Sequence, residues 1–344
     1  MLEGFWYIGA GSRDVRSDRP MAVSLLNQPL VLFRDQFQKV HALEDRCPHR
    51  GMALSPGWQK GASIRCRFHG WRFAASGECL EVPALANGTV PQSACVRPYP
   101  VEERDGWVWV YMGNDLCPKP TTPPPALPVP PDGSRMVSAR MSVSVKVRFD
   151  FAVDSLVDPA HVPWVHNRFF RQKRVVRLKE KEFTRLPLGF RTVSENVELP
   201  NTFVFRALTP GLARARSAVE FVLPGIHFET HEVGTRFASV MLVATPLTTE
   251  TTRLDITVGW NFLRWLPVAW LVRLTMRTTM AQDRGVLEPQ ERGNREKTTM
   301  ILSQEADTLS VWYRRLQKYH LDQLAGLPNV VHPVPERATL RWRT

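Results

Sequence analysis

The hydrophobic and polar pattern divides the chain into two parts, which are separated by a proline-rich segment. Residues 118–131, PKPTTPPPALPVPP, hold eight prolines in fourteen positions, and such a run favours an extended, semi-rigid connection. Before it, short β-prone runs such as PLVLFRD and GWVWVYMG are separated by Gly, Pro, Asn and Ser. We predict an all-β domain over residues 1–116, a linker over 117–135 and a second domain over 136–344.

The second part alternates between strand and helix patterns. Residues 140–151, RMSVSVKVRFDF, alternate strictly between apolar and polar side chains, which predicts a half-buried strand. Similar patterns at 218–230, 236–246 and 252–262 predict an antiparallel sheet, while residues 267–290 have helical periodicity with Pro267 in the first turn. The second domain is therefore predicted to be α+β.

Composition narrows the class of protein. At 344 residues, with 43% hydrophobic and 23% charged residues, the chain is long enough for two folded domains. Its first residues, MLEGFWYIGAGSRD, lack the basic and apolar regions of a secretory signal, and five cysteines are an odd number for a disulfide framework. We expect a cytoplasmic protein. The apolar segment 262–276 is interrupted by Arg264, Pro267 and Arg273, so a peripheral membrane contact is the most it allows.

The net charge of +12 does not by itself indicate nucleic-acid binding. Most basic residues are interleaved with apolar and acidic ones, so we predict no nucleic-acid partner. The densest basic run, residues 168–182, has two interpretations: a solvated face beside a strand, or a docking patch for an acidic electron-transfer protein.

Two short segments combine cysteine with histidine. They read Cys47-x-His49 and Cys66-x-x-His69. Zinc knuckles usually chelate one ion with pairs of cysteines, whereas here each loop offers one cysteine and one histidine. Two loops of this mixed type suit a two-iron cluster in which both thiolates bind one iron and both imidazoles bind the other. A zinc site and a chance arrangement are the alternatives.

A second set of candidate ligands lies in residues 151–167, FAVDSLVDPAHVPWVHN, which contain Asp158, His161 and His166. Five residues along an ideal helix are about 140° apart, so the two histidines share an ion only if the chain bends between them, and Pro163 would provide the break. Otherwise they are a hydrogen-bonded pair near a helix end, and Asp158 before Pro159 is a helix N-cap.

A carboxylate to complete this set is offered by residues 274–290. Asp283 projects onto an otherwise apolar helix face that also holds Val272, Met276, Thr279, Met280 and Leu287. A carboxylate there is costly unless it is paired or bound to a metal, so we predict a metal ligand, with a salt bridge to an arginine as the alternative and Glu288 as the next candidate. His227 and His231 in HFETH would lie roughly 13 Å apart on a strand, too far to share an ion, which favours a pocket or surface role.

The motifs CPHRG and CRFHGW resemble the cluster-binding loops of Rieske proteins. Together with the second set, the chain resembles the Rieske non-haem iron oxygenases of the monooxygenase and demethylase branch. The resemblance implies a Rieske [2Fe-2S] domain followed by a helix-grip catalytic domain around a central antiparallel sheet. It implies the ligands of both centres: Cys47 and Cys66 on the inner iron, His49 and His69 on the outer iron, and His161, His166 and Asp283 on a mononuclear Fe(II).

The same resemblance implies the reaction. Electrons from NAD(P)H would arrive through a separate ferredoxin or reductase and cross by way of His69, Asp158 and His161 of neighbouring subunits in a homotrimer. The enzyme would use O2 to oxidise a hydrophobic, ring-containing substrate by hydroxylation or demethylation. The role of Asp154 is not defined by the resemblance. Two alternatives stay open: an oxygenase of chlorophyll-type tetrapyrroles, and a Rieske electron carrier with a ligand-binding second domain.

Overall fold

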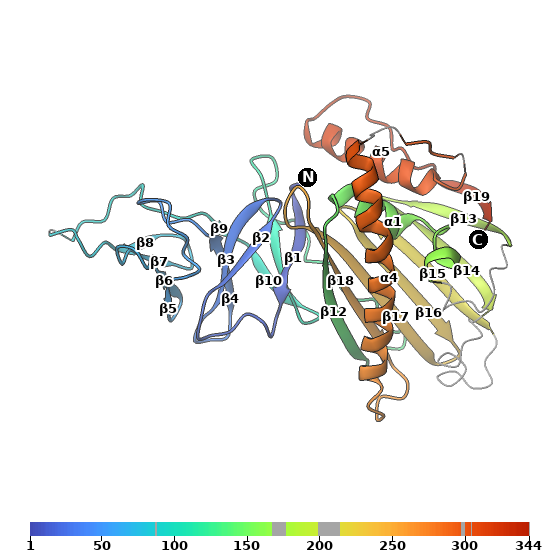
Figure 1. Cartoon of the computed structure of the whole chain (residues 1–344), viewed down its shortest axis with the longest axis horizontal. Helices are drawn as coiled ribbons and strands as arrows, with labels where there is room; N and C mark the ends of the chain where they lie inside the picture. Colours follow the sequence, from blue (N-terminus) through green and yellow to red (C-terminus); the bar gives the residue numbers. More distant parts are fainter. Residues whose placement is uncertain (87, 167–176, 199–213, 297–299, 304, 344) are drawn as a thin grey trace. The chain divides into compact units, whose positions relative to one another are not determined.

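The computed structural model describes residues 1–343 except 87, 167–176, 199–213, 297–299 and 304 (Figure 1). By its internal contacts the chain divides into two units. Unit 1 comprises residues 1–126 together with 246–249, and unit 2 comprises residues 127–245 and 250–344. The division at residues 126 and 127 falls inside the proline-rich segment 118–131.

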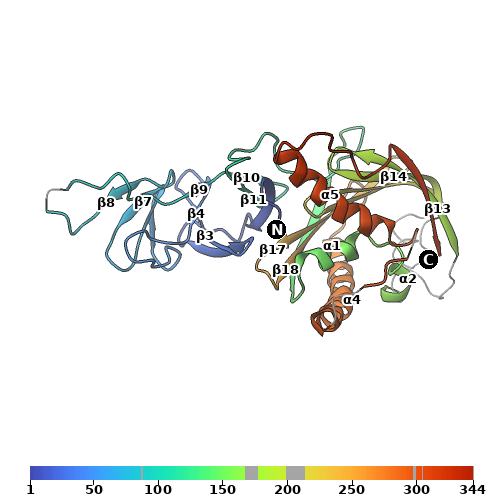
Figure 2. The ribbon, with the colours of Figure 1, turned by 90° about the horizontal axis from the view of Figure 1, so that it is seen from above.

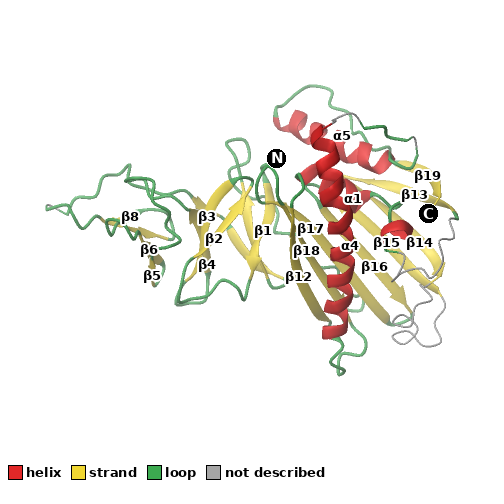
Figure 3. Ribbon diagram, in the orientation of Figure 1, coloured by secondary structure: helices red, strands yellow, loops and turns green. Residues whose placement is uncertain are grey.

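Unit 1 consists of three small antiparallel sheets (Figure 3). The first contains β1 (Phe5–Gly11), β11 (Trp107–Met112) and β10 (Val101–Arg104). The second contains β2 (Met21–Leu25), β3 (Gln28–Arg34), β4 (Val40–Glu44) and β9 (Pro98–Tyr99). The third contains β5 (Trp58–Lys60), β6 (Ser63–Arg65), β7 (Arg72–Ala74) and β8 (Cys79–Glu81). The described residues of this unit include no helix, so the predicted all-β fold is confirmed.

The sequence of strand β3 is a continuous apolar run rather than an alternating one because each face of the strand packs into a hydrophobic cluster. Leu30 and Leu32 belong to the hydrophobic cluster that β3 shares with β1 and β11. Val31 and Phe33 point the other way, into the cluster that contains Cys47 and Cys66. Both faces of this strand are therefore buried, and its second face anchors the loops that carry the predicted cluster ligands.

Unit 2 is an eight-stranded antiparallel sheet with helices (Figure 2), so the predicted α+β fold is confirmed. The strands in spatial order are β12 (Val137–Val145), β18 (Thr252–Trp260), β17 (Arg236–Pro246), β16 (Ile226–Val233), β15 (Arg214–Val222), β14 (Gly189–Glu198), β13 (Leu178–Leu186) and β19 (Arg337–Arg343). The helices are α1 (Phe149–Val157), α2 (Val162–Val165), α4 (Ala269–Glu296) and α5 (Thr308–Leu324).

Close packing holds α1 against the sheet. Gly225 lies in the turn between β15 and β16, where an added Cβ would lie 2.8 Å from Cγ2 of Val153 and 3.0 Å from Cζ of Phe149. Only glycine allows α1 to approach this turn so closely. On α5, Trp312 and Tyr313 are buried and contact aromatic rings of β13, β14 and β15.

The predicted strand over 140–151 is correct only in its first half. Strand β12 ends at Val145, and residues 149–157 form α1 instead. The apolar residues of this stretch also fit a helical spacing, because Phe149, Ala152, Val153 and Val157 are the buried positions of α1. Likewise, the run 218–230 is a hairpin of two strands, β15 and β16, rather than one strand.

Helix α4 begins later and ends later than its pattern predicted. It starts at Ala269, two residues after Pro267, and continues through Pro289 to Glu296. Within the described part of the chain, no helix is long and apolar enough to cross a membrane. The basic run 168–182 can be followed only from residue 177 onward, since residues 168–176 lie outside the described residues.

Candidate metal centres

Two loops of unit 1 carry the predicted cluster ligands and share one backbone geometry. In each, the amide of the glycine four residues after the cysteine donates to the cysteine carbonyl, at 2.9 Å for Gly51 and 3.1 Å for Gly70. The cysteine amide donates to the carbonyl five residues further on, at 2.8 Å for both Cys47 and Cys66. Both glycines have positive φ, 73° and 74°, a conformation that side chains disfavour. The glycines are therefore part of what shapes the loops.

The thiols and imidazoles of these loops lie at different depths. Cys47 and Cys66 are 2% and 1% exposed, whereas His49 is exposed and His69 is half-buried. The two imidazole rings are 4.5 Å apart between centroids. Burial raises the pKa of Cys47 to about 11, and the nearby Cys66 adds to the rise. Two inner sulfurs and two outer imidazoles fit the mixed ligation of a Rieske cluster, and the iron would favour the thiolate form of Cys47 despite its raised pKa.

Aromatic and proline side chains surround the outer histidines. The Trp71 indole stacks on the His49 ring with centroids 4.8 Å apart and an interplanar angle of 5°. Pro83 lies against Gly70, where an added Cβ would be 3.2 Å from the Pro83 Cγ. Both contacts restrict the second loop and the His49 ring.

Sequence reasoning missed Asp45, which organises the first loop. This carboxylate is 8% exposed. Its Oδ1 accepts hydrogen bonds from the amides of Leu54 (2.6 Å) and Ser55 (2.7 Å), and its Oδ2 accepts one from the Ser55 hydroxyl (2.6 Å). These bonds fasten the two ends of the segment that holds Cys47 and His49. A carboxylate two residues before CPHRG is the only signal the sequence offers for this role.

Unit 2 brings His161, His166 and Asp283 together from two elements, the short helix α2 and the long helix α4. One potential ligand atom from each lies within 4.8 Å of the other two. His166 Nε2 is 3.0 Å from Asp283 Oδ1, and the two histidine rings are 5.5 Å apart between centroids. His161 and His166 flank α2, and Asp283 is in the middle of α4. Two imidazoles and one carboxylate at this spacing match the donor set of a non-haem iron site.

Packing and hydrogen bonds orient these side chains. His166 is 5% exposed, and its Nδ1 lies 3.0 Å from Gln282 Oε1, which leaves Nε2 facing Asp283. Burial alone would lower the pKa of His166, but Asp283 raises it overall. Met276 and Met280 are buried on the Asp283 side of α4, as the helical pattern predicted. Among the described residues, Asp283 is thus paired with a histidine rather than with the arginine considered as an alternative.

The structure contradicts one alternative interpretation and one prediction at this site. Asp158 is not an N-cap: it is the C-cap of α1, and its Oδ1 accepts a hydrogen bond from the Ala160 amide at 2.7 Å. Pro163 does not break a helix between the histidines. It lies in the first turn of α2, a single turn whose two caps are His161 and His166. The histidines meet because the helix is only one turn long.

The remaining candidates lie outside this group of three. Asp158 Oδ2 is 3.5 Å from His161 Nδ1, and Asp154 pairs with Arg314 of α5. The Glu288 carboxylate accepts a hydrogen bond from Arg284 at 2.9 Å and does not belong to the group of His161, His166 and Asp283. His227 and His231 are both on β16, on either side of Glu229.

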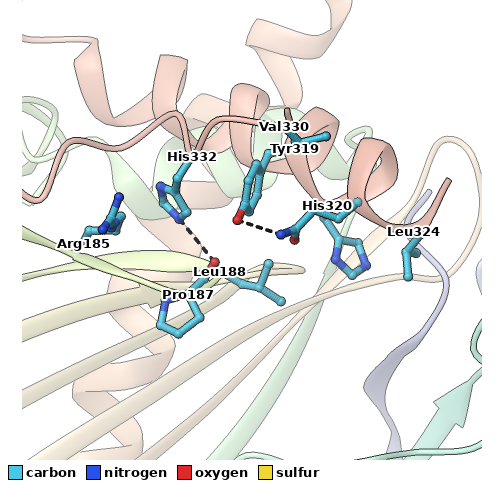
Figure 4. Close-up of a pocket in the computed structure, with 9 residues that line it drawn as sticks. Arg185, Pro187, Leu188, Tyr319, His320, Leu324, Val330 and His332 are labelled. Carbon is cyan, nitrogen blue, oxygen red and sulfur yellow. Dashed lines mark hydrogen bonds between the residues drawn. The ribbon is translucent and has the colours of Figure 1, made fainter. Parts of the chain in front are cut away.

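A separate surface pocket of about 610 Å³ lies beside α5 (Figure 4). Its walls include Arg185, Tyr319, His320 and His332. The His332 ring is hydrogen-bonded to the Pro187 carbonyl, and the Tyr319 hydroxyl accepts a hydrogen bond from Gln323. None of the predicted metal ligands lines it.

Comparison with known families covers most of the chain. Residues 5–100 match the Rieske [2Fe-2S] domain. Residues 145–323, more than half of the chain, match the vanillate O-demethylase oxygenase C-terminal domain. The chain belongs to the Rieske non-haem iron oxygenases. Both matched regions contain the predicted ligands of their centre, so this Rieske oxygenase has the expected order of domains.

Individual relatives of this Rieske oxygenase resemble it over shorter stretches. The chain is 34% identical over 173 residues to the iron–sulfur subunit of a toluene-4-sulfonate monooxygenase system from Comamonas testosteroni (48% of this chain, 46% of the relative). It is 33% identical over 165 residues to the oxygenase component of dicamba O-demethylase from Stenotrophomonas maltophilia (47% and 46%). It is 31% identical over 169 residues to chlorophyllide a oxygenase from Chlamydomonas reinhardtii (49% and 25%). The matches thus span less than half of each relative.

The fold of the whole chain resembles a solved structure. Dicamba monooxygenase bound to 3,6-dichlorosalicylic acid superposes with a TM-score of 0.79 at 22% identity, covering 95% of this chain and 99% of that one. This likeness concerns the fold, and it extends across both domains.

Proposed function

We propose that this chain is the oxygenase component of a Rieske non-haem iron monooxygenase. The observation that carries the proposal is the presence of two separate donor sets, one in each unit. The cluster ligands are Cys47, His49, Cys66 and His69, and the Fe(II) ligands are His161, His166 and Asp283. When bound, the cluster passes single electrons and the mononuclear Fe(II) activates O2.

The protein's own groups prepare the mononuclear site. Gln282 holds the His166 ring with Nε2 toward Asp283. Met276 and Met280 provide an apolar wall that limits water near the carboxylate. Asp158, fixed by the Ala160 amide, turns its second oxygen toward His161 Nδ1 and acts as a positioning residue for that ring.

The proposed substrate is a small aromatic compound that is hydroxylated or demethylated. The relatives named above act on toluene-4-sulfonate and on dicamba. By the same family argument, a ferredoxin or reductase delivers electrons from NAD(P)H, and the chain works as a homotrimer in which Asp158 connects His161 to His69 of a neighbouring subunit. A cytoplasmic location and a peripheral membrane contact stay sequence-based predictions.

Two other functions are distinguished by specific observations. The similarity to chlorophyllide a oxygenase favours a tetrapyrrole substrate as the second candidate. A Rieske electron carrier with a ligand-binding second domain would not require His161, His166 and Asp283 to converge in a largely buried position. Product analysis with a panel of small aromatic compounds, terpenoids and chlorophyll-type tetrapyrroles separates the first two.

Iron and acid-labile sulfide analysis tests the proposal. The wild-type protein should hold about three irons and two sulfides per chain. Asp283→Ala should reduce iron to about two and leave the sulfide and the visible spectrum unchanged, whereas Cys47→Ser should abolish that spectrum. Glu288→Ala is the matched control, because it removes a carboxylate from the same helix and should keep three irons.

The possible results separate the alternatives. Two irons in the wild type would favour the electron carrier. Three irons in Asp283→Ala together with two in Glu288→Ala would move the ligand role to Glu288. An unchanged visible spectrum in Cys47→Ser would refute the cluster assignment.

A further inference from the structure

The connection between β18 and α4 forms one end of unit 2 together with the first turns of α4, and we call this segment, residues 262–277, the α4 tip. In Figure 1 it is drawn in orange and extends past the ends of the neighbouring strands. Asn261 holds its base, because its side chain accepts a hydrogen bond from the Phe237 amide at 2.7 Å and donates one to the Thr235 carbonyl at 3.0 Å. The α4 tip is therefore fastened to the sheet at its base and projects beyond it.

Large apolar side chains of the α4 tip are exposed. Trp265 is 80% exposed and Trp270 is 63% exposed, while Leu266 and Leu274 are 39% and 52% exposed. Single exposed apolar residues are common on proteins, but two tryptophans and two leucines within ten residues form a patch that indicates an interaction surface. Trp270 and Leu274 are one helical turn apart, so they lie on the same side of α4.

The charges of the α4 tip have one sign. Residues 256–282 contain no Asp or Glu, and their charged residues are Arg264, Arg273 and Arg277. All three arginines are exposed. Arg273 and Arg277 follow Trp270 by three and seven residues, which puts them along the exposed side of the helix that carries this tryptophan. The apolar patch is thus flanked by positive charge.

A neighbouring turn adds to this charge. Arg264 donates a hydrogen bond to the Arg135 carbonyl at 3.1 Å, which brings a fourth exposed arginine to the α4 tip. The same turn contains Asp132, whose carboxylate accepts a hydrogen bond from the Ser134 amide at 2.9 Å. Four arginines near a single carboxylate leave this end of unit 2 positive, so its partner should be negative.

The shape and charge of the α4 tip distinguish between possible partners. A second copy of the chain related by a two-fold axis would place the same arginines against one another, which costs free energy. A lipid bilayer that contains anionic lipids offers phosphates to the arginines and a boundary between water and hydrocarbon to the tryptophans. A projecting segment can enter such a surface, whereas a protein partner would need a groove to receive it. The observations therefore favour a lipid surface.

The α4 tip is separate from the proposed iron ligands, although it belongs to the same helix as Asp283. Thirteen residues of α4 lie between Trp270 and Asp283 in the count from one to the other, which corresponds to about 20 Å along the helix axis. Substitutions at the exposed end of α4 therefore leave the candidate metal site unchanged.

We propose that the α4 tip binds the surface of an anionic lipid bilayer. Its tryptophans and leucines enter the boundary between the headgroups and the acyl chains, and its arginines bind lipid phosphates. This inference develops the peripheral membrane contact predicted from residues 262–276, and it is independent of the proposed reaction.

Sedimentation with lipid vesicles tests the proposal. The whole metal-loaded chain is mixed with vesicles of phosphatidylcholine that contain about 30% phosphatidylglycerol, or of phosphatidylcholine alone, at about 0.1 M salt. The wild type should bind the anionic vesicles at least about tenfold more tightly than the neutral ones, because each arginine near an anionic surface strengthens binding about fivefold. The double variant Arg273→Gln/Arg277→Gln should lose at least about tenfold of this affinity for the same reason.

A second double variant tests the apolar contribution. Trp265→Ser/Trp270→Ser should weaken binding to the anionic vesicles at least about tenfold, because it removes the apolar area that would leave water. Phe37→Ser is the matched control: this side chain is 79% exposed but lies in unit 1, and the variant should bind like the wild type.

The charge variant has its own control, and several results would overturn the inference. Arg315→Gln/Arg343→Gln removes two exposed arginines from α5 and β19 and should keep the affinity within about threefold. Absence of wild-type binding at about millimolar lipid, or an equal loss in the control variants, would refute a lipid surface. A lower oligomeric state of Trp265→Ser/Trp270→Ser would assign the α4 tip to a second copy, and binding of polyglutamate without binding of vesicles would assign it to an acidic protein. Iron content and turnover are measured without lipid, so failure here would leave the proposed function standing.

Discussion

Replacing Asp45 tests whether a single buried carboxylate holds the first cluster loop. Asp45→Ala removes three short hydrogen bonds and leaves the amides of Leu54 and Ser55 without their acceptor. Hydrogen bonds to a charged group are worth about 1.5–3 kcal/mol each, which would give roughly 4.5–9 kcal/mol if they were additive. Bonds that share one acceptor are not additive, and water can reach Ser55 more easily than Leu54. We expect a loss of about 3–5 kcal/mol.

Two milder variants set the scale for this loss. Asp45→Asn keeps an oxygen for the two amides and loses the negative charge, so it should cost about 1–2 kcal/mol. Ser55→Ala removes only the hydroxyl bond and should cost about 1 kcal/mol. The predicted order of destabilisation is therefore Asp45→Ala, then Asp45→Asn, then Ser55→Ala.

The assay is urea unfolding of the cluster-loaded protein, followed by the visible circular dichroism of the cluster and by tryptophan fluorescence. With a slope of roughly 2 kcal/mol per M, Asp45→Ala should lower the midpoint of the cluster signal by about 1.5–2.5 M. The cluster signal should be lost before the tryptophan fluorescence change is complete, because six of the eleven tryptophans lie in unit 2. If Asp45→Ala unfolds within about 0.5 M of the wild type, the three bonds do not determine the stability of the loop and the reasoning is refuted.

Three further predictions concern unit 2. Asp158→Asn should keep both metal centres, and its free energy of unfolding should stay within about 1 kcal/mol of the wild type, because asparagine preserves the loop hydrogen bond. Cluster reoxidation after addition of substrate and O2 to the prereduced protein should nevertheless slow at least about tenfold. A wild-type rate would limit this residue to shaping the loop. Gly225→Ala should destabilise the chain by about 1–3 kcal/mol in urea unfolding because its Cβ would overlap α1, whereas Gly285→Ala, in open space on α4, should be neutral or slightly stabilising. Glu229 Oε1 lies 3.0 Å from His231 Nε2. Glu229 has a lowered pKa in the folded protein, so its contribution to folding stability is present above its unfolded pKa near 4.5. His231 has a raised pKa, so its contribution to folding stability is present below its unfolded pKa near 6.5 and is lost as the pH rises. The stability difference between wild type and Glu229→Gln should therefore be larger at pH 5.5 than at pH 8, and an equal difference at both would argue against the ion pair.

The ligand motifs could be predicted from the sequence because they depend on local geometry. A cysteine, a histidine and a glycine within five residues shape one loop, and the glycine φ values of 73° and 74° come from contacts inside that loop. The spacing of His161 and His166 was equally local. The prediction that Asp283 needs a partner followed from the apolar stripe of its helix, a property of α4 alone.

Local patterns failed where two structures suit the same residues. Residues 149–151 continue the alternation of the predicted strand, but they also begin the helical repeat of residues 149–157, and packing of Phe149 and Val153 over Gly225 favours the helix. The same cause explains why Asp158 follows a helix instead of preceding one. Such ambiguities are settled by contacts with strands far away in the sequence.

The sequence by itself determined the division into two domains and the residue types of the metal ligands. It also determined the segments that carry the cluster ligands and the two histidines of the iron site. Only the tertiary structure decided which side chain faces which. Asp283 reaches His166 across more than a hundred residues, and Arg264 reaches the turn that holds Arg135 across a similar separation in the sequence. Strand register and helix packing bring these side chains together. Both arise from the burial of the whole core rather than from the spacing of neighbouring residues.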